Sequence, residues 1–228
     1  MPAHRRTARD DRRRRLGQNF LRPELAARFV EEAGVTAGDL VVEIGAGSGA
    51  ITRALARRGA EVLAVEVDPV WAERLKRNLA AHHGDRVRVI ASDFLAMRLP
   101  NRPFRVVACL PFGNTTAIVS RLLGEGREHL ERADLIVQWE VARKRSAVPA
   151  STLRSTAWAP WWEFTLGRRI AATEFRPVPR VDGGVLVITR REPALLPPAM
   201  AARYEAFVRA NWPFAQTIRR SDAHRASS

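Results

Sequence analysis

The sequence has little material for covalent cross-links or membrane insertion. It contains a single cysteine, Cys109, which excludes an internal disulfide. No stretch approaches the ~20 apolar residues of a membrane-spanning helix. The N-terminus is rich in arginine but lacks the apolar segment of a secretory signal, and no internal repeat is visible. These absences predict a cytoplasmic protein.

Acidic residues are scarce relative to basic ones. The 228 residues include 24 acidic and 38 basic side chains, for a net charge of +14. A protein this basic usually binds polyanions, and nucleic acid is the first candidate. Much of the excess lies in the first 22 residues, and residues 1–15 predict a disordered, arginine-rich arm. The alternative is an arginine-rich tail that has no partner.

A glycine-rich stretch around residues 40–50 is the strongest motif. Leu40 to Ile44 predicts a buried strand, and alternating glycines at Gly45, Gly47 and Gly49 lead into residues at helical spacing. Glycines in such a turn let a ligand approach the backbone where a Cβ would block it. The start of the helix adds free N–H groups.

Two ligand types use a turn of this kind. In dinucleotide-binding folds the turn has the consensus G-x-G-x-x-G/A, which Gly45, Gly47 and Ala50 satisfy weakly. S-adenosylmethionine-dependent methyltransferases write it acidic-x-G-x-G-x-G, which the stretch from Glu43 to Gly49 satisfies fully. Because a sulfonium and an ammonium are cationic, the extra carboxylate favours the second ligand.

Acidic residues follow the next two predicted strands. Glu66 ends a strand over 61–67, about 20 residues past the glycine turn, where a carboxylate accepts both ribose hydroxyls. Asp68 is predicted to cap a helix over 70–81. Asp93 follows a strand over 86–91, and it either accepts from an adenine N6 amine, with a neighbouring backbone N–H serving N1, or caps a turn.

The rest of the pattern predicts an α/β fold. A strand over 104–108 delivers Cys109-Leu110-Pro111-Phe112 to the carboxyl edge of the sheet, where ligands bind in open α/β sheets. The closing strands, 163–171 and 184–190, are expected to be antiparallel neighbours. Further elements are predicted as helices over 24–33, 115–123 and 199–211 and a strand over 133–139.

Residues 140–162 combine basic and tryptophan side chains, which suits a groove for nucleic acid. The basic residues are Arg143, Lys144, Arg145 and Arg154. Of Trp158, Trp161 and Trp162, we expect at least two to lie in the core.

Together these blocks resemble the ribosomal RNA adenine N6-methyltransferases, and the Erm-type erythromycin-resistance methylases most of all. The matching blocks run in family order from 16 to about 190: LGQNFL at 16–21, VEIGAGSG at 42–49, VEVD at 65–68, SDF at 92–94, LPF at 110–112 and FRPVPRVD at 175–182. The small-subunit dimethylases share the first and last blocks, so that branch stays an alternative.

The resemblance implies a seven-stranded, Rossmann-like sheet with helices on both faces over residues 16–190, followed by a short helical extension over 191–228. It also implies a monomer that transfers methyl from S-adenosylmethionine to N6 of an adenine in 23S ribosomal RNA. One or two methyl groups there would block macrolide, lincosamide and streptogramin B antibiotics. Phe112 and Phe175 would sandwich the flipped-out base.

Other roles carry over by position. The residues expected to line the cofactor are Gln18, Asn19, Leu21, Gly45, Gly47, Glu66, Asp93, Phe94 and Cys109. The catalytic block would be Cys109, Leu110, Pro111 and Phe112 together with Phe175. The residues expected to hold RNA are Arg12, Arg13, Arg14, Arg15, Arg143, Lys144, Arg145 and Arg154.

The chain departs from the family in two places. Cys109 stands where the family has an asparagine that accepts an N6 hydrogen, and a thiol is a weak acceptor. The C-terminal helical lobe is expected to be truncated, which would leave RNA binding to the N-terminal arm and residues 143–154. These departures leave a catalytically silent RNA-binding or ribosome-assembly factor as an alternative. A nicotinamide-dependent oxidoreductase is a second alternative, against which Glu43 and the Cys109–Phe112 block argue.

Overall fold

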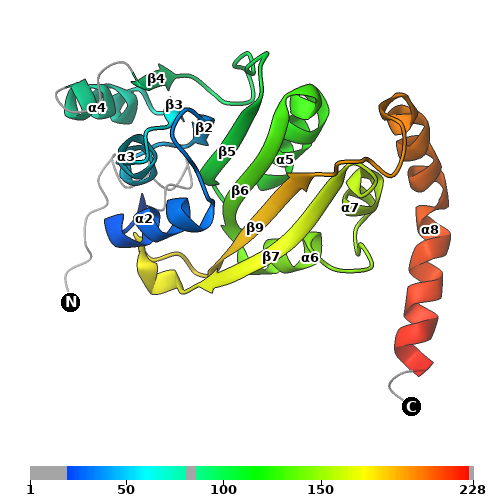
Figure 1. Cartoon of the computed structure of the whole chain (residues 1–228). Coiled ribbons are helices and arrows are strands. Elements are labelled where there is room, and N and C mark those ends of the chain that lie inside the picture. Colours follow the sequence, from blue (N-terminus) through cyan, green and yellow to red (C-terminus); the bar gives the residue numbers. More distant parts are fainter. Residues whose placement is uncertain (1–19, 81–85, 226–228) are drawn as a thin grey trace, which may run out of the picture.

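The computed structural model describes residues 20–80 and 86–225 (Figure 1). Seven strands form one sheet in the order β4-β3-β2-β5-β6-β9-β7. In chain order they are β2 (Leu40–Ile44), β3 (Glu61–Glu66), β4 (Val87–Ala91), β5 (Phe104–Cys109), β6 (Leu130–Gln138), β7 (Trp162–Ile170) and β9 (Gly183–Arg190). Strand β9 is antiparallel to both its neighbours, β6 and β7, as predicted for the closing strands.

Helices cover both faces of this sheet, as predicted (Figure 1). One face carries α2 (Pro23–Glu32), α3 (Ala50–Arg57) and α4 (Pro69–Ala80), and the other carries α5 (Thr115–Gly124), α6 (Trp139–Arg145) and α7 (Leu153–Trp158). Short 3-10 turns lie at Glu125–Glu128, Ala172–Glu174 and Pro198–Met200.

Strand β2 lies in the middle of both cores. Its residues alternate between the two layers: Val41 packs with α2 and α3, whereas Val42 packs with α5. All five residues of β2 are buried, because a central parallel strand is covered on both faces. The continuous apolar run in the sequence reflects this burial.

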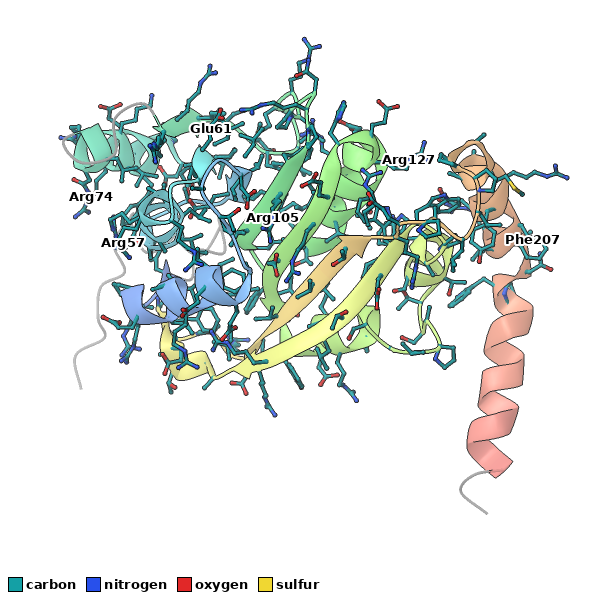
Figure 2. All side chains as sticks on the ribbon, viewed as in Figure 1. Arg57, Glu61, Arg74, Arg105, Arg127 and Phe207 are labelled. Atoms are coloured by element: carbon teal, nitrogen blue, oxygen red, sulfur yellow. The ribbon has the colours of Figure 1, made fainter. Side chains whose placement is uncertain are left out.

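Two predicted elements differ from the structure by three residues or more at one end. The fifth strand begins at Leu130 rather than 133, because Leu130 pairs with Phe104 of β5 and Arg132 pairs with both β5 and β9, although Glu131 and Arg132 interrupt the apolar run. The last helix does not end at Asn211: α8 runs over Ala201–Arg225 and includes Pro213. It stands away from the sheet, and Phe207 on it is 62% exposed (Figures 1 and 2).

The tryptophan prediction is confirmed. Trp161 and Trp162 are buried in the core, and only Trp158 is partly exposed. The Trp161 indole N–H donates to the Leu196 carbonyl at 2.9 Å, and its ring contacts Tyr204 of α8. These contacts hold the start of α8 against the body of the protein.

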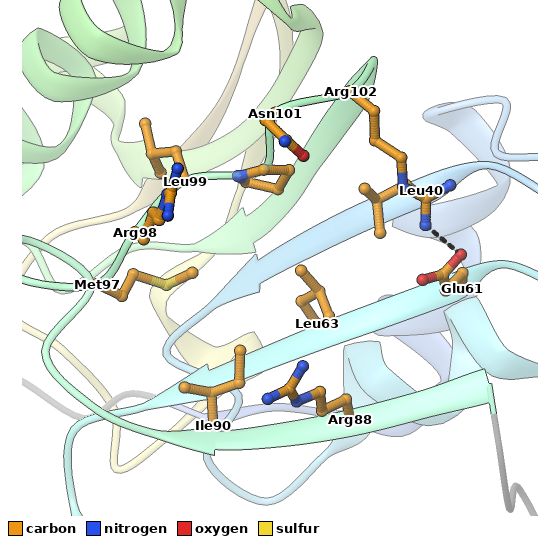
Figure 3. Close-up of a pocket in the computed structure, with 11 residues that line it drawn as sticks. Leu40, Glu61, Leu63, Arg88, Ile90, Met97, Arg98, Leu99, Asn101 and Arg102 are labelled. Atoms are coloured by element: carbon orange, nitrogen blue, oxygen red, sulfur yellow. Dashed lines mark hydrogen bonds and ion pairs between the residues drawn. The ribbon is translucent and has the colours of Figure 1, made fainter.

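The segment between β4 and β5 forms no helix. It leaves a cleft of about 530 Å³ over the ends of β2, β3 and β4, with an apolar floor that includes Leu63 and Ile90 and a rim that includes Arg88, Arg98 and Arg102 (Figure 3). Arg102 pairs with Glu61 across it.

In residues 20–80 and 86–225, no helix has both the length and the apolar character needed to cross a bilayer. The same residues hold no group of three acidic, histidine or cysteine side chains that could bind a metal.

Candidate active site

The glycine loop turns over the carboxyl end of β3. The N–H groups of Gly45 and Ala46 both donate to the Val65 carbonyl, at 2.8 and 3.1 Å. Gly45 is exposed, with φ +76°, and a Cβ there would meet nothing closer than the Cys109 carbonyl at 3.8 Å. The backbone at Gly45 is therefore open to a ligand on the side of the Cys109–Phe112 block.

The other two glycines of the loop are required by packing. A Cβ on Gly47 would lie 2.6 Å from the Phe20 ring, and one on Gly49 would lie 2.3 Å from the Leu75 side chain. Both residues also have positive φ, which favours glycine. Packing inside the protein therefore explains Gly47 and Gly49, whereas Gly45 has a positive φ and open space beside it.

The Glu66 carboxylate is hydrogen-bonded to the backbone of the glycine loop. One carboxylate oxygen accepts the Gly47 N–H at 2.7 Å, and the other accepts the Asp68 N–H at 2.9 Å. Burial raises the pKa of this carboxyl, while the backbone donors, Asp68 and Gly47 first, lower it. A carboxylate has about four acceptor positions, so Glu66 can accept from a further donor. Asp68 caps α4 as predicted, because its side chain accepts the Val70 N–H at 2.9 Å.

Glu43 has a different environment from the one the sequence suggested. It is 1% exposed, and the Thr52 hydroxyl of α3 donates to its carboxyl at 2.5 Å. Burial raises the pKa of Glu43 to about 8, although the hydrogen bonds from Thr52 lower it. At neutral pH the group is mainly protonated, so it joins β2 to α3 rather than supplying a negative charge for a sulfonium.

The titration of Glu43 predicts how stability depends on pH. Between its ordinary pKa of 4.5 and about 8, the folded state keeps a proton that the unfolded state releases. The free energy of unfolding therefore falls as pH rises through this window, by on the order of 4 kcal/mol. Glu43→Gln should lose this dependence, so its stability relative to the wild type should rise from pH 5 to pH 8 in urea unfolding. A difference between the two proteins that is constant with pH would contradict the assignment.

Asp93 satisfies the turn-capping role and is still accessible. Its Oδ1 accepts the Leu95 N–H at 2.9 Å, and the residue is exposed beyond the end of β4. The second carboxylate oxygen remains for an adenine amine, so the two roles do not exclude each other. The Phe94 side chain lies in the core, under the guanidinium of Arg121, so only its backbone can face a ligand.

The Cys109–Phe112 block lies beside the glycine loop. The Leu110 N–H donates to the Ile136 carbonyl of β6 at 2.9 Å, and the Leu110 side chain is buried. Burial, and then the nearby Glu43, raise the pKa of the Cys109 thiol to about 12. The thiol therefore stays protonated, which argues against a nucleophilic cysteine.

Phe112 and Phe175 lie together, as the resemblance implies, but not as a parallel sandwich. Their ring centroids are 6.4 Å apart and the rings meet edge to face at 74°. Phe175 is fully buried against Gly183, whereas Phe112 is partly exposed. Rings in direct contact prefer this edge geometry. A base would therefore enter by separating the two rings.

A two-stranded ribbon joins the first and last family blocks. Strand β1 (Phe20–Leu21) pairs with β8 (Phe175–Arg176), with Leu21 opposite Phe175. The Phe20 ring lies 4.8 Å from that of Trp71 in α4 and also covers Gly47. The sequence marked both blocks but gave no signal for this pairing, because two-residue strands have no periodicity. Gln18, Asn19 and Arg12 to Arg15 lie outside the described residues.

The other basic residues predicted to hold RNA lie on α6 and α7. Arg143 pairs with Glu140 at 2.9 Å, and Lys144 is exposed. In the described part of the chain, neither Arg145 nor Arg154 has an acidic partner. Arg145 contacts the hydroxyls of Thr116 and Thr152, and Arg154 contacts that of Ser120. Burial, and then Arg154, lower the pKa of Arg145.

The sequence is similar to those of known proteins. Residues 9–216 match the family described as ribosomal RNA adenine dimethylase. The mycinamicin-resistance protein MyrB of Micromonospora griseorubida is 44% identical over 198 residues, which cover 86% of this chain and 62% of MyrB. An rRNA adenine N-6-methyltransferase of Corynebacterium diphtheriae is 39% identical over 193 residues, 84% of this chain and 74% of that protein. The chain thus spans less than two thirds of MyrB.

Solved structures agree. The 23S rRNA methyltransferase ErmE superposes with a TM-score of 0.76 at 34% identity, over 84% of this chain and 78% of ErmE. A dimethyladenosine transferase from Plasmodium falciparum has a TM-score of 0.71 at 19% identity, over 79% of this chain and 66% of its own, and shares the fold. The match over most of the chain, with the glycine loop, Glu66 and the Cys109–Phe112 block at one edge, shows that this chain belongs to the ribosomal RNA adenine dimethylase family.

Proposed function

We propose that this chain transfers methyl from S-adenosylmethionine to N6 of an adenine in 23S ribosomal RNA and thereby confers resistance to macrolide, lincosamide and streptogramin B antibiotics. The observation that carries the proposal is the meeting, at one sheet edge, of an open glycine backbone, a buried carboxylate and a pair of phenyl rings. ErmE is named a 23S rRNA methyltransferase, which supports the substrate. MyrB is named a mycinamicin-resistance protein, which supports the phenotype. Residues 16–190 would form the catalytic unit.

The residues at this edge fit the cofactor. Gly45 lets it approach the loop, Glu66 would accept the ribose hydroxyls, and Asp93 would accept the adenine amine through its second oxygen. Leu21 and the Cys109 backbone border the same space by position, and Gln18 and Asn19 belong to the block that precedes β1. When bound, the cofactor supplies a methyl group that is already activated by a cationic sulfonium.

The protein then has to position the target nitrogen. Phe112 and Phe175 would replace the stacking that the adenine loses when it leaves its RNA strand, worth roughly 1–3 kcal/mol per base. The Leu110 carbonyl would accept one N6 hydrogen and orient the nitrogen lone pair toward the methyl group. Because the donor is activated, positioning is the main contribution that the chain has to make.

Cys109 is expected to limit the rate. A thiol is a weak acceptor for the second N6 hydrogen, which should cost about 1–3 kcal/mol, or roughly ten- to a hundredfold in rate. Cys109→Asn restores an amide oxygen at that position and should raise kcat on an RNA substrate by about tenfold. Cys109→Ala, which removes the side-chain acceptor altogether, is the control. A Cys109→Asn rate at or below that of the wild type would refute the acceptor role.

Arg145 and Arg154 are the best-placed described residues for RNA phosphates. Burial, and then the Arg154 guanidinium, lower the pKa of Arg145, and neither arginine has a carboxylate partner among the described residues, so an anion would relieve the repulsion. The double variant Arg145→Gln, Arg154→Gln should weaken RNA binding about tenfold and reduce the slope of log K against log salt by roughly two. Arg57→Gln with Arg127→Gln, in α3 and in the 3-10 turn after α5 (Figure 2), removes the same charge as a control. Equal slopes for the two double variants would contradict a specific site.

The decisive experiment is transfer of a labelled methyl group to unmethylated 23S ribosomal RNA, with the modified adenine mapped afterwards. We expect methylation at N6 of one adenine, and growth on macrolides when a sensitive bacterium expresses the chain. Methylation of 16S RNA alone would favour the small-subunit branch. RNA binding without any methyl transfer would show a catalytically silent RNA-binding protein and overturn the proposal.

A further inference from the structure

A second pocket lies around the start of β9, close to the residue on which the Phe175 ring packs. It encloses about 330 Å³ and is lined by Gln138, Trp139, Glu140, Arg169, Arg180, Val181 and Asp182. Its walls are the end of β6, the first residues of α6, the end of β7 and the loop before β9. None of the roles assigned above uses these residues.

The sheet register places this pocket next to the expected base site. Gln138 pairs with Gly183 where β6 and β9 meet. A Cβ on Gly183 would lie 2.8 Å from the Phe175 ring, and one on Gly184 would lie 2.7 Å from the Trp139 ring, so the two rings pack on opposite faces of β9 at adjacent residues. On the neighbouring strand, Cys109 pairs with Ile136, two residues before Gln138. The pocket therefore lies at the same end of β9 as Phe175, across the sheet from it.

The pocket contains a cation that lies over an aromatic ring, and both side chains are held in place. The Arg169 guanidinium carbon lies 5.6 Å from the Trp139 ring centroid. Asp182 holds the same guanidinium through two contacts of 2.8 Å, and the Arg169 side chain is 61% exposed. The Ala172 N–H, and then Arg169, lower the pKa of Asp182, which keeps it ionised. Trp139 is fixed in turn because it packs on Gly184, where a Cβ would lie 2.7 Å from the ring.

The charges around the stack leave one cation free. Arg169 neutralises Asp182, and Arg143 pairs with Glu140 at 2.9 Å. Arg180 is exposed at the rim and, within residues 20–80 and 86–225, makes no ion pair. A planar guanidinium over an aromatic ring stacks bases of any sequence, and a free arginine binds a phosphate. Gln138 adds an amide that can contact the edge of a base.

We propose that this pocket binds the nucleotide next to the target adenine in the same RNA strand, with its base on the Arg169–Trp139 stack and its phosphate at Arg180. The inference rests on the proposed function for the identity of the neighbouring base. The stacking itself does not depend on that identity, because proteins that bind single-stranded RNA stack its splayed bases on aromatic and guanidinium planes. The pocket would thereby fix the strand on one side of the base that is turned out.

Arg169→Lys tests the stack, because lysine keeps the charge and loses the plane. We expect the KM for RNA to rise roughly tenfold, with kcat and the KM for S-adenosylmethionine unchanged, since a stacked base contributes about 1–3 kcal/mol. Arg168→Lys is the matched control, because Arg168 is the preceding residue of β7 and pairs with Glu32 of α2. Equal KM values for the two variants would overturn the inference.

A direct measurement separates this inference from the proposed function. RNA hairpins from 23S ribosomal RNA, with 4-thiouridine at each position flanking the target adenine in turn, are irradiated with the protein and S-adenosylhomocysteine. The expected cross-link is from an adjacent position to Trp139 or its immediate neighbours. Cross-links only to other parts of the chain would refute the pocket even if methyl transfer is normal. Absence of methyl transfer together with a cross-link at Trp139 would refute the enzyme and leave the RNA site.

Discussion

Phe112→Ala is expected to lower methyl transfer to RNA by about a hundredfold while S-adenosylmethionine binds with unchanged affinity. The side chain is partly exposed and contacts Phe175 through its ring, so it is the accessible wall of the proposed site for the base. Its loss removes roughly 1–3 kcal/mol of stacking and the positioning of N6 that depends on it. Single-turnover methylation of 23S RNA and calorimetry of cofactor binding measure the two quantities separately.

The choice between the two rings follows from burial. Phe175 is 0% exposed, and its replacement by alanine should destabilise the fold by about 3–5 kcal/mol, which would confuse catalysis with stability. Phe207→Ala is the better control, since that ring is 62% exposed on α8. If Phe112→Ala and Phe207→Ala methylate RNA at similar rates, the ring has no role in holding the base.

Glu66→Gln is expected to weaken S-adenosylmethionine binding by about a hundredfold. Both carboxylate oxygens accept backbone N–H groups, from Gly47 and Asp68, inside a buried site. An amide turns one acceptor into a donor that faces another donor, at a cost of about 1–3 kcal/mol, and it also loses a bond to the ribose. Isothermal titration with S-adenosylmethionine measures the effect.

A control on the same strand separates the site from the fold. Glu61→Gln changes an exposed carboxylate at the other end of β3, where it pairs with Arg102, and should bind the cofactor as the wild type does. Thermal unfolding of both variants shows whether the glycine loop has loosened. Wild-type affinity in a folded Glu66→Gln protein would remove Glu66 from the cofactor site.

The sequence predicts most strongly where one physical cause dominates. The bounds of β2 were predicted without error, because burial on both faces demands an uninterrupted apolar run. The Asp68 cap followed from an acidic residue before Pro69 at a helix start. The family blocks located Glu66 and the Cys109–Phe112 block at one edge, since carboxyl ends of parallel strands converge there.

What could not be predicted depends on contacts between distant segments. No local pattern shows that Phe20 covers Gly47 or that Leu75 packs on Gly49, so both glycines seemed to serve a ligand alone. The protonation of Glu43 arises from its burial under α3, which a residue name does not show. The edge contact of Phe112 with Phe175 and the pocket beside Trp139 likewise depend on the register of β6 against β9.

The β1–β8 ribbon has a consequence for the order of events in a catalytic cycle. Leu21, beside the proposed cofactor site, is paired backbone to backbone with Phe175, which is one wall of the proposed site for the base. Because the two strands are hydrogen-bonded, a shift of one moves the other. The proposed cofactor site and the proposed base site are therefore not expected to open independently. We therefore expect release of the spent cofactor and release of the methylated RNA to be coupled.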